Sequence, residues 1–199
     1  MNAQDRTSAT GSLAAASVAD FFVWLDGQQD EPDVTPMKLQ KLLYYAQAQH
    51  LAVTGGRLFD EDIEAWDHGP VVRSQYHRFK EFGRQVIVCE QSAGRPRLDE
   101  SVCEFLRRIW DAYGGYSAAR LRAMTHDEAP YQQAYDGASD TVIPDDVMFA
   151  FFHSGRGAAR LVTHSDDCLI VTREDLAAVD AVDDAEFVRA WREASLAYA

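Results

Sequence analysis

The clearest pattern of apolar and polar positions in the chain lies in residues 35–56, TPMKLQKLLYYAQAQHLAVTGG. Thr35 is a favourable N-cap residue, Pro36 suits the first helical position, and the two final glycines terminate a helix. The pattern therefore predicts one long helix. The positions that follow the 3.6-residue period of a core-facing stripe are Leu39, Leu42, Leu43, Ala46, His50 and Val53. The residues on its other faces include Lys38, Lys41, Tyr45 and Gln49.

Other segments show the same helical period. One helix follows Ser17, which can cap it, and ends in the stretch 27–33. A second strong helix follows Asp99 and ends at the glycines 114–115. Three shorter helices are expected: from Ser117 to Met124, within THDEAPYQQAY, and within IPDDVMFAFF. The core residues predicted from the two strongest helices are Leu39, Leu42, Leu43, Val102, Phe105 and Ile109.

Two short strands are also expected. The run IEAW at 63–66 alternates apolar and polar residues and is broken at Gly69 and Pro70. Pro70 can then open a helix that ends at Gly83. The apolar run QVIVCE at 85–90 is expected to be a second strand that could pair with IEAW, which would make a two-stranded β element.

These elements predict a mainly helical α+β fold, with one compact helical domain, a small two-stranded β element, and a C-terminal extension made of a strand and a helix. Residues 1–16 lack an apolar period and are expected to be a mobile tail, 17–152 form the domain, and 153–199 form the extension, a candidate partner-specific arm. In the extension, DCLIV predicts a strand and DDAEFVRAWREA a helix, whereas GRGAAR at 155–160 is interpreted as a linker. With 199 residues, 47% of them apolar, the chain is long enough for one such core.

The formal net charge of −13 disfavours binding to DNA or RNA, because such a surface repels phosphate backbones. No segment approaches the roughly 18–20 continuous apolar residues of a membrane helix, and no basic cluster precedes an apolar block at the start of the chain. We therefore expect a cytoplasmic protein. The three cysteines, Cys89, Cys103 and Cys168, have no CxxC spacing and are interpreted as small buried apolar residues.

No motif in the sequence predicts catalysis, a cofactor or a metal site. The six histidines lack the spacing of a zinc protease site, although folding could still bring His68 and His77 together. Sequences of the GxSxG, Walker and GxGxxG types are absent. Carboxylate pairs such as Asp145-Asp146 stand at helix starts, where capping is the simplest interpretation. His50 is interpreted as a hydrogen-bonded histidine at the core boundary.

The segment EAWDHGPVVRSQYHRF at 64–79 permits three interpretations: an active site, a nucleic-acid surface, or a surface that binds another protein. The basic residues in and after it are Arg73, Arg78, Lys80 and Arg84. This cluster is local in an acidic chain, which favours ion pairing over a track for phosphates. Trp66 and Tyr76 are expected to anchor the strand and the helix on either side of the Gly-Pro corner. The segment is therefore interpreted as architectural, with outward-facing residues for a partner protein.

Several segments, taken in order, resemble a known family. They are KLQKLLYYAQ at 38–47, IEAW at 63–66, GPVV at 69–72 with Tyr76 four residues on, YGGYSAARLRAMTHDEAPYQQAY at 113–135, and IPDDVMFAFF at 143–152. Over residues 18–152 the chain resembles the Panacea domain, the family of SocA-like antitoxins and phage-associated GepA-like proteins. It departs from the family pattern at Pro130-Tyr131, where members commonly have Pro-Trp.

The resemblance implies an antitoxin that neutralises the product of a neighbouring toxin gene by direct protein–protein contact, without a cofactor and without catalysis. One family member is described instead as a proteolytic adaptor that delivers its toxin to a protease, so a protease is left open as a second partner, as is a homodimer. A DNA-binding autorepressor is disfavoured by the charge and by the lack of a recognisable helix-turn-helix. The interface residues predicted from expected exposure and composition are Lys38, Lys41, Tyr45, Arg73, Gln75, Arg78, Arg189 and Trp191.

Overall fold

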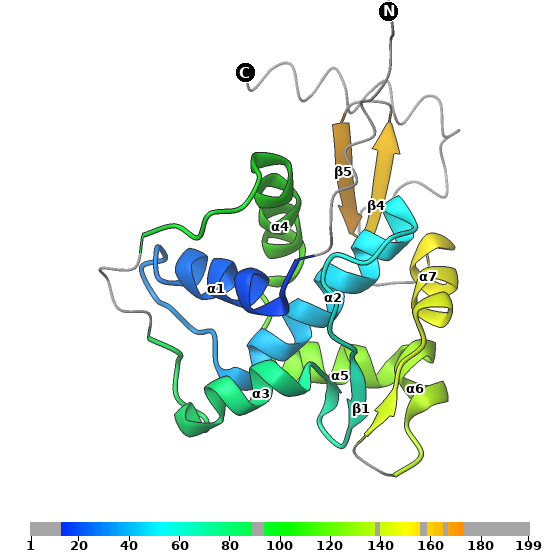
Figure 1. Ribbon diagram of the computed structural model, residues 1–199, viewed down its shortest axis with the longest axis horizontal. Coiled ribbons are helices and arrows are strands. Elements are labelled where there is room, and N and C mark those ends of the chain that lie inside the picture. Colours follow the sequence, from blue (N-terminus) through cyan, green and yellow to red (C-terminus); the bar gives the residue numbers. More distant parts are fainter. Residues whose placement is uncertain (1–12, 89–93, 138–139, 156–158, 165–166, 173–199) are drawn as a thin grey trace, which may run out of the picture.

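The computed structural model describes residues 13–88, 94–137, 140–155, 159–164 and 167–172. Within these residues, helices and two small sheets are arranged around a central helix, α2 (Figure 1). The prediction of a mainly helical α+β fold is confirmed. The elements are α1 (Ala15–Asp26), α2 (Pro36–Thr54), β1 (Glu64–Trp66), β2 (Gly69–Val71), α3 (Arg73–Phe79), the 3-10 helix η1 (Lys80–Phe82), α4 (Glu100–Tyr113), α5 (Ala118–Asp127), α6 (Ala129–Ala134), β3 (Thr141–Val142), α7 (Asp145–His153), β4 (Ala159–His164) and β5 (Asp167–Thr172).

Helix α2 begins and ends where the sequence predicts. Thr35 is its N-cap, and Thr35 Oγ1 accepts a hydrogen bond from the Lys38 backbone N–H at 3.4 Å. Gly55 adopts a φ of 73°, the left-handed conformation that ends a helix, and its N–H donates to Leu51 O. Fifteen of the 19 residues are buried, which is far more than one face. The helix is therefore internal, and α1, α4, α5 and α7 pack around it.

The expected strand at 63–66 is confirmed as β1, but its partners differ from the prediction. β1 lies between β2 and β3, and both pairings are antiparallel. Pro70 therefore lies in a strand, opposite Ala65, and helix α3 begins only after Val72. A proline is tolerated in β2 because this is an edge strand, with no ladder on its outer side.

The expected strand QVIVCE does not form in its described part, residues 85–88. Ile87 is buried there, and its N–H donates to Val34 O at 2.8 Å. This segment therefore lies beside the loop that precedes α2 and not beside β1. The apolar run is explained by burial of Ile87 in the core and not by sheet pairing, so its strand-favouring composition was misleading.

The folded chain begins before Ser17. Leu13 N–H donates to Leu58 O at 2.9 Å, and α1 begins at Ala15. The Glu61 carboxylate accepts the Ala15 N–H at 2.9 Å, so a distant loop satisfies a backbone donor that a capping side chain would otherwise take. The predicted cap at Ser17 is wrong for this reason, and residues 13–16 do not belong to a mobile tail.

The remaining helices form in the segments predicted for them. α4 follows Asp99, α6 lies within its expected run, and α7 ends one residue past its own, at His153. Ser117 caps α5, since its Oγ accepts the Arg120 N–H at 3.2 Å, and the helix continues three residues past the expected end at Met124, to Asp127. Helix type was therefore easier to predict than helix length.

The predicted core residues belong to a single apolar cluster around α2. The fully buried members among them are Leu39, Leu42, Leu43 and Ile109. Val102 and Phe105 are partly buried and pack against the same cluster. His50 lies at its boundary, where Nδ1 is 2.9 Å from Gly56 O and the ring packs edge-on against Phe105. The interpretation of His50 as a hydrogen-bonded boundary residue is confirmed.

Beyond α7, β4 and β5 form an antiparallel hairpin. β5 contains the predicted strand DCLIV, whereas β4 begins at Ala159, inside the segment that was interpreted as a linker. The backbones of β4 and β5 run close to α2 and α4, respectively. The predicted C-terminal helix lies outside the described residues.

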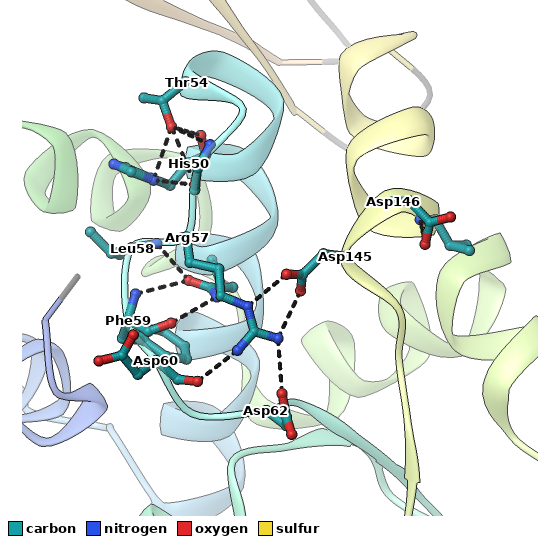
Figure 2. Close-up of polar contacts among 12 residues, drawn as sticks. His50, Thr54, Arg57, Leu58, Phe59, Asp60, Asp62, Asp145 and Asp146 are labelled. Atoms are coloured by element: carbon teal, nitrogen blue, oxygen red, sulfur yellow. Dashed lines mark hydrogen bonds and ion pairs between the residues drawn. The ribbon is translucent and has the colours of Figure 1, made fainter. Parts of the chain in front are cut away.

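Arg57 joins the loop that follows α2 to the start of α7, which is distant in sequence (Figure 2). Its Nε and Nη2 donate to the two carboxylate oxygens of Asp145 at 2.6 and 3.1 Å. Nη2 also donates to Asp62 at 2.8 Å, and Nη1 donates to Asp60 O at 2.6 Å. This forked geometry fixes the start of α7 against the loop that follows α2.

We expect Arg57→Ala to lower the free energy of unfolding by about 1–3 kcal/mol, because several charge-assisted hydrogen bonds are lost at once. Arg57→Lys should recover only part of this loss, since an ammonium group cannot bind both Asp145 oxygens in a fork. Urea denaturation of each variant measures the change. Arg84→Ala is the control, because Arg84 is exposed and has no bonded partner among the described residues. Equal losses for Arg57→Ala and Arg84→Ala would contradict the assigned role.

Candidate interaction site

Two side chains of α2 support the β1–β2 hairpin. Gln40 Oε1 accepts a hydrogen bond from the Val72 N–H at 2.8 Å, and Lys41 Nζ donates to Pro70 O at 3.0 Å. Both bonds satisfy backbone groups in or just after β2, which is the edge strand of its sheet among the described residues. Side chains of an internal helix thus take the place of a neighbouring strand.

Lys41 is almost fully buried, with 1% of its surface exposed. Burial first, and the nearby Arg122 charge second, lower the pKa of its ammonium group to about 7. Gly69 lies directly against this group, since a Cβ there would stand 2.8 Å from Lys41 Nζ and 2.9 Å from Thr125 Oγ1. Gly69 also has a φ of 95°. Both the conformation and the close approach therefore require glycine.

Side chains from α5 and α6 and from the residue after α6 hold the tip of the same hairpin. Tyr131 OH donates to Trp66 O at 2.9 Å, and Tyr135 OH donates to Asp67 Oδ1 at 2.5 Å. His126 Nε2 lies 3.1 Å from Asp67 O. The hairpin is thus fixed by α2 on one side and by the α5–α6 region on another.

Four residues form the outer surface of the hairpin and of α3, which we call the Trp66–Tyr76 face: Glu64, Trp66, Arg73 and Tyr76. The rings of Trp66 and Tyr76 are in contact, with centroids 4.9 Å apart. Glu64 accepts a hydrogen bond from Trp66 Nε1 at 2.8 Å and forms an ion pair with Arg73, also at 2.8 Å. The Arg73 guanidinium lies 5.6 Å from the Trp66 ring centroid. This contact between strand and helix is the geometry that the architectural interpretation of Trp66 and Tyr76 requires.

Glu128 joins α2 to the start of α6. Only 6% of its surface is exposed, and its two carboxylate oxygens accept hydrogen bonds from Tyr44 OH at 3.0 Å and Tyr45 OH at 3.1 Å. Burial raises the pKa of this carboxyl group to about 8, although the two tyrosine bonds act in the opposite direction. Burial likewise raises the pKa of both tyrosines well above their usual value.

Within the described residues, no group of three or more His, Cys, Asp or Glu side chains is arranged to hold a metal ion. In the same part of the chain, no helix combines the length and the apolar character needed to cross a membrane. Cys103 is buried, as expected, whereas Cys89 and the side chain of Cys168 lie outside what the structure describes.

Comparison with known proteins shows a similarity to one family. Residues 39–132 match the family model described as "Antitoxin SocA-like, Panacea domain". This match spans slightly less than half of the chain. A curated relative is Antitoxin SocA of Caulobacter vibrioides (strain NA1000 / CB15N), which is 29% identical over 125 residues. The match covers 58% of this chain and 66% of the relative, slightly less than two thirds of its length. No solved structure gives a significant match to the chain.

The part that matches the Panacea model begins inside α2 and ends inside α6. It includes the hairpin, α3, α4 and α5, but it leaves out α1 and α7. Both of these helices pack against α2 and bury its apolar residues. The physical unit is therefore larger than the matched segment, in keeping with the resemblance over residues 18–152.

Three residues that were expected at the surface of α2 are buried: Lys38, Lys41 and Tyr45. Lys38 Nζ contacts Asp33 Oδ1 at 2.5 Å and Gly114 O at 2.6 Å. The Tyr45 ring stacks on Tyr113 with centroids 3.9 Å apart. The expectation of exposure was wrong because α2 has neighbours on every side, so its polar faces are covered as well as its apolar stripe.

Gln75 was also expected to face outward, but only 3% of its surface is exposed, because α3 packs against α1 and α2. Arg73 and Arg78 do lie at the surface, where Arg73 pairs with Glu64 and Arg78 pairs with Asp20 at 2.6 Å. The remaining predicted interface residues, Arg189 and Trp191, lie outside the described residues.

One feature of the sequence did indicate that α2 is buried, but the periodicity of its apolar residues does not reveal it. The chain contains 32 Asp and Glu residues, yet residues 36–54 contain none. A solvated helix in so acidic a chain would normally carry carboxylates on its polar faces. The partner Glu128 gave no such signal, because a single Glu in a turn is usually exposed and only the fold brings it to Tyr44 and Tyr45.

Gly69→Ala should lower the free energy of unfolding by about 2–4 kcal/mol, since it combines a left-handed conformation with a clash against Lys41 and Thr125. Gly137→Ala is a matched control. Gly137 has a φ of 88°, but a Cβ at this position would meet nothing within 4 Å, so only the conformational cost of about 1–2 kcal/mol should remain. Thermal and urea unfolding measure the loss of stability in each of the two variants. Losses of the same size would show that the contact with Lys41 is unimportant.

Glu128→Gln should change the pH dependence of stability. The folded-state pKa of Glu128 is raised from 4.5 to about 8, so the folded protein binds this proton more tightly than the unfolded chain. Its contribution to stability is fully present below the unfolded pKa and is lost as pH rises toward 8. Between pH 5 and pH 7, the wild-type protein should lose roughly 1–3 kcal/mol relative to the variant. Parallel curves of unfolding free energy against pH would contradict this assignment.

Proposed function

We propose that this protein is an antitoxin that neutralises a cognate protein toxin by binding it directly, without catalysing a reaction. The observation that carries the proposal is the match of residues 39–132 to a family described by its antitoxin SocA. The similarity to a curated protein named Antitoxin SocA supports it.

The chemistry of the described residues is consistent with a binding role. Lys41 and Glu128 are the two residues whose pKa values are shifted most strongly toward neutral pH. Both lie inside the protein, where they form hydrogen bonds with backbone or tyrosine groups of their own chain. In contrast, Trp66, Arg73 and Tyr76 are partly or largely exposed on a rigid hairpin and helix. Aromatic and arginine side chains of this kind are enriched at protein–protein interfaces.

The partner proposed is the product of the neighbouring toxin gene, met in the cytoplasm. A protease that receives the bound toxin and a second copy of this chain are further partners that the same proposal leaves for experiment. Arg73 and Arg78 are retained as proposed interface residues, since both lie at the surface. Nucleic acid is not proposed as a partner, because the chain carries a net charge of −13.

Co-expression tests the proposal. The full chain should restore the growth of cells that express the neighbouring gene product, and a tagged chain should retain that product through purification. A toxin from an unrelated locus serves as the control and should neither be rescued nor retained. Light scattering of the purified complex gives its stoichiometry, and the lifetime of the toxin after translation is stopped separates sequestration from degradation. Rescue without any complex, or binding to promoter DNA that falls steeply with salt, would contradict direct neutralisation.

A further inference from the structure

The Trp66–Tyr76 face combines exposure with a fixed conformation. Tyr76 is 37% exposed, one of the few large aromatic residues of the described chain with so much free surface. Its ring packs against Trp66 with centroids 4.9 Å apart, and this contact favours one orientation of the ring. An exposed aromatic ring that is already held in place loses little conformational entropy when a partner covers it.

Glu64 is the residue that orders this face. Its side chain is only 13% exposed, and the same carboxylate binds Trp66 Nε1 and the Arg73 guanidinium. One carboxylate therefore fixes an indole and a guanidinium side by side. Arg73 Nε and Nη2 face Glu64, which leaves Nη1 available to an acceptor on a partner. Trp, Tyr and Arg are the residue types most enriched among binding hot spots.

The segment from 73 to 84 carries more cations than carboxylates, unlike the whole chain, and the Asp140 carboxylate also lies close enough to act on Arg73. The residues from 73 to 84 include one carboxylate, Glu81, and four cations: Arg73, Arg78, Lys80 and Arg84. Glu64 and Asp20 neutralise Arg73 and Arg78. Lys80 and Arg84 are exposed and form no ion pair among the described residues. An otherwise acidic protein of net charge −13 therefore presents two exposed cations in the segment that follows Tyr76.

We propose that the Trp66–Tyr76 face, together with the exposed Lys80 and Arg84 farther along the same segment, docks a protein segment in which an apolar residue is flanked by carboxylates. Identifying the owner of that segment as the toxin rests on the proposed function. The apolar residue covers the Trp66 and Tyr76 rings, and the carboxylates face Arg73 Nη1, Lys80 and Arg84. Figure 1 shows α3 and the hairpin at the periphery of the fold.

A protein segment fits this face better than a nucleic acid does. Two of the four cations are already neutralised by Glu64 and Asp20, so the number of phosphates that could be bound is small. The remaining acidic surface would repel the rest of a polynucleotide. A short carboxylate-bearing segment needs only the few donors that Arg73 Nη1, Lys80 and Arg84 provide.

Tyr76→Ala is the first test, with the full chain and the purified product of the neighbouring toxin gene as the probe. Loss of an interface anchor should weaken binding at least about tenfold. Phe149→Ala is the matched control, because Phe149 on α7 is 36% exposed, and its binding should stay within about twofold of wild type. Tyr76→Phe, which keeps the ring, should bind nearly as well as wild type. Melting curves confirm that each variant is folded.

The double variant Lys80→Glu and Arg84→Glu tests the charge. It should lower the association rate constant by about tenfold at low salt and weaken the dependence of that rate on salt. If this double variant binds the toxin like the wild-type chain, the proposal is overturned. Unchanged affinity of Tyr76→Ala for the toxin overturns it as well. If the charge reversal instead abolishes binding to promoter DNA and leaves toxin binding intact, the face belongs to a nucleic acid and the proposal is wrong.

These experiments distinguish failure of the proposed antitoxin function from failure of the proposed docking face. If the wild-type chain neither binds nor neutralises the neighbouring gene product, the proposed function is wrong, and the toxin as occupant of this face is wrong with it. If the wild-type chain binds the toxin and every face variant binds equally well, the antitoxin function stands and only the docking face is overturned.

Discussion

The polar side chains of helix α2 have only protein groups to bind, because the helix is buried on every side. An unpaired buried hydrogen-bonding group costs about 1–3 kcal/mol, so each of these side chains must find a partner elsewhere in the chain. The partners lie in several different segments of the chain. Lys38 binds the loop before α2 and residue 114, Lys41 binds strand β2, and Gln47 binds residues 58–59. Gln49 binds Tyr113, and Tyr44 and Tyr45 both bind Glu128. The arrangement of the other elements follows from these bonds.

This constraint connects the interior with the surface. Lys41 and Gln40 hold the hairpin from inside, and Glu64 orders Trp66 and Arg73 on its outside. A hairpin of two three-residue strands would be only marginally stable alone. Supported in this way, it can present aromatic and arginine side chains in one conformation, which is what a binding surface needs in order to lose little entropy on association.

The exposed part of the candidate site could be predicted, whereas its buried part could not. The short segment formed by the hairpin and α3 contains Trp66, Arg73, Tyr76 and Arg78. Other elements can cover only part of so short a segment, so these residue types already indicated a surface. Lys38 and Lys41 follow the spacing of a solvated helix face, and nothing within the helix reveals that other elements cover that face. The prediction that Gln75 is exposed was wrong for the same reason, since α1 and α2 cover one side of α3.

The sequence by itself determined the local elements: the N-cap at Thr35, the end of α2 at Gly55, the cap at Ser117, and the apolar stripes that form the core. These depend on interactions within one or two turns, which residue type and spacing specify. Only the tertiary structure decided that Pro70 lies in a strand, that β3 and not QVIVCE completes the sheet, and that Glu128 meets two tyrosines. Those outcomes depend on contacts between segments that lie far apart in the chain, which have no local pattern.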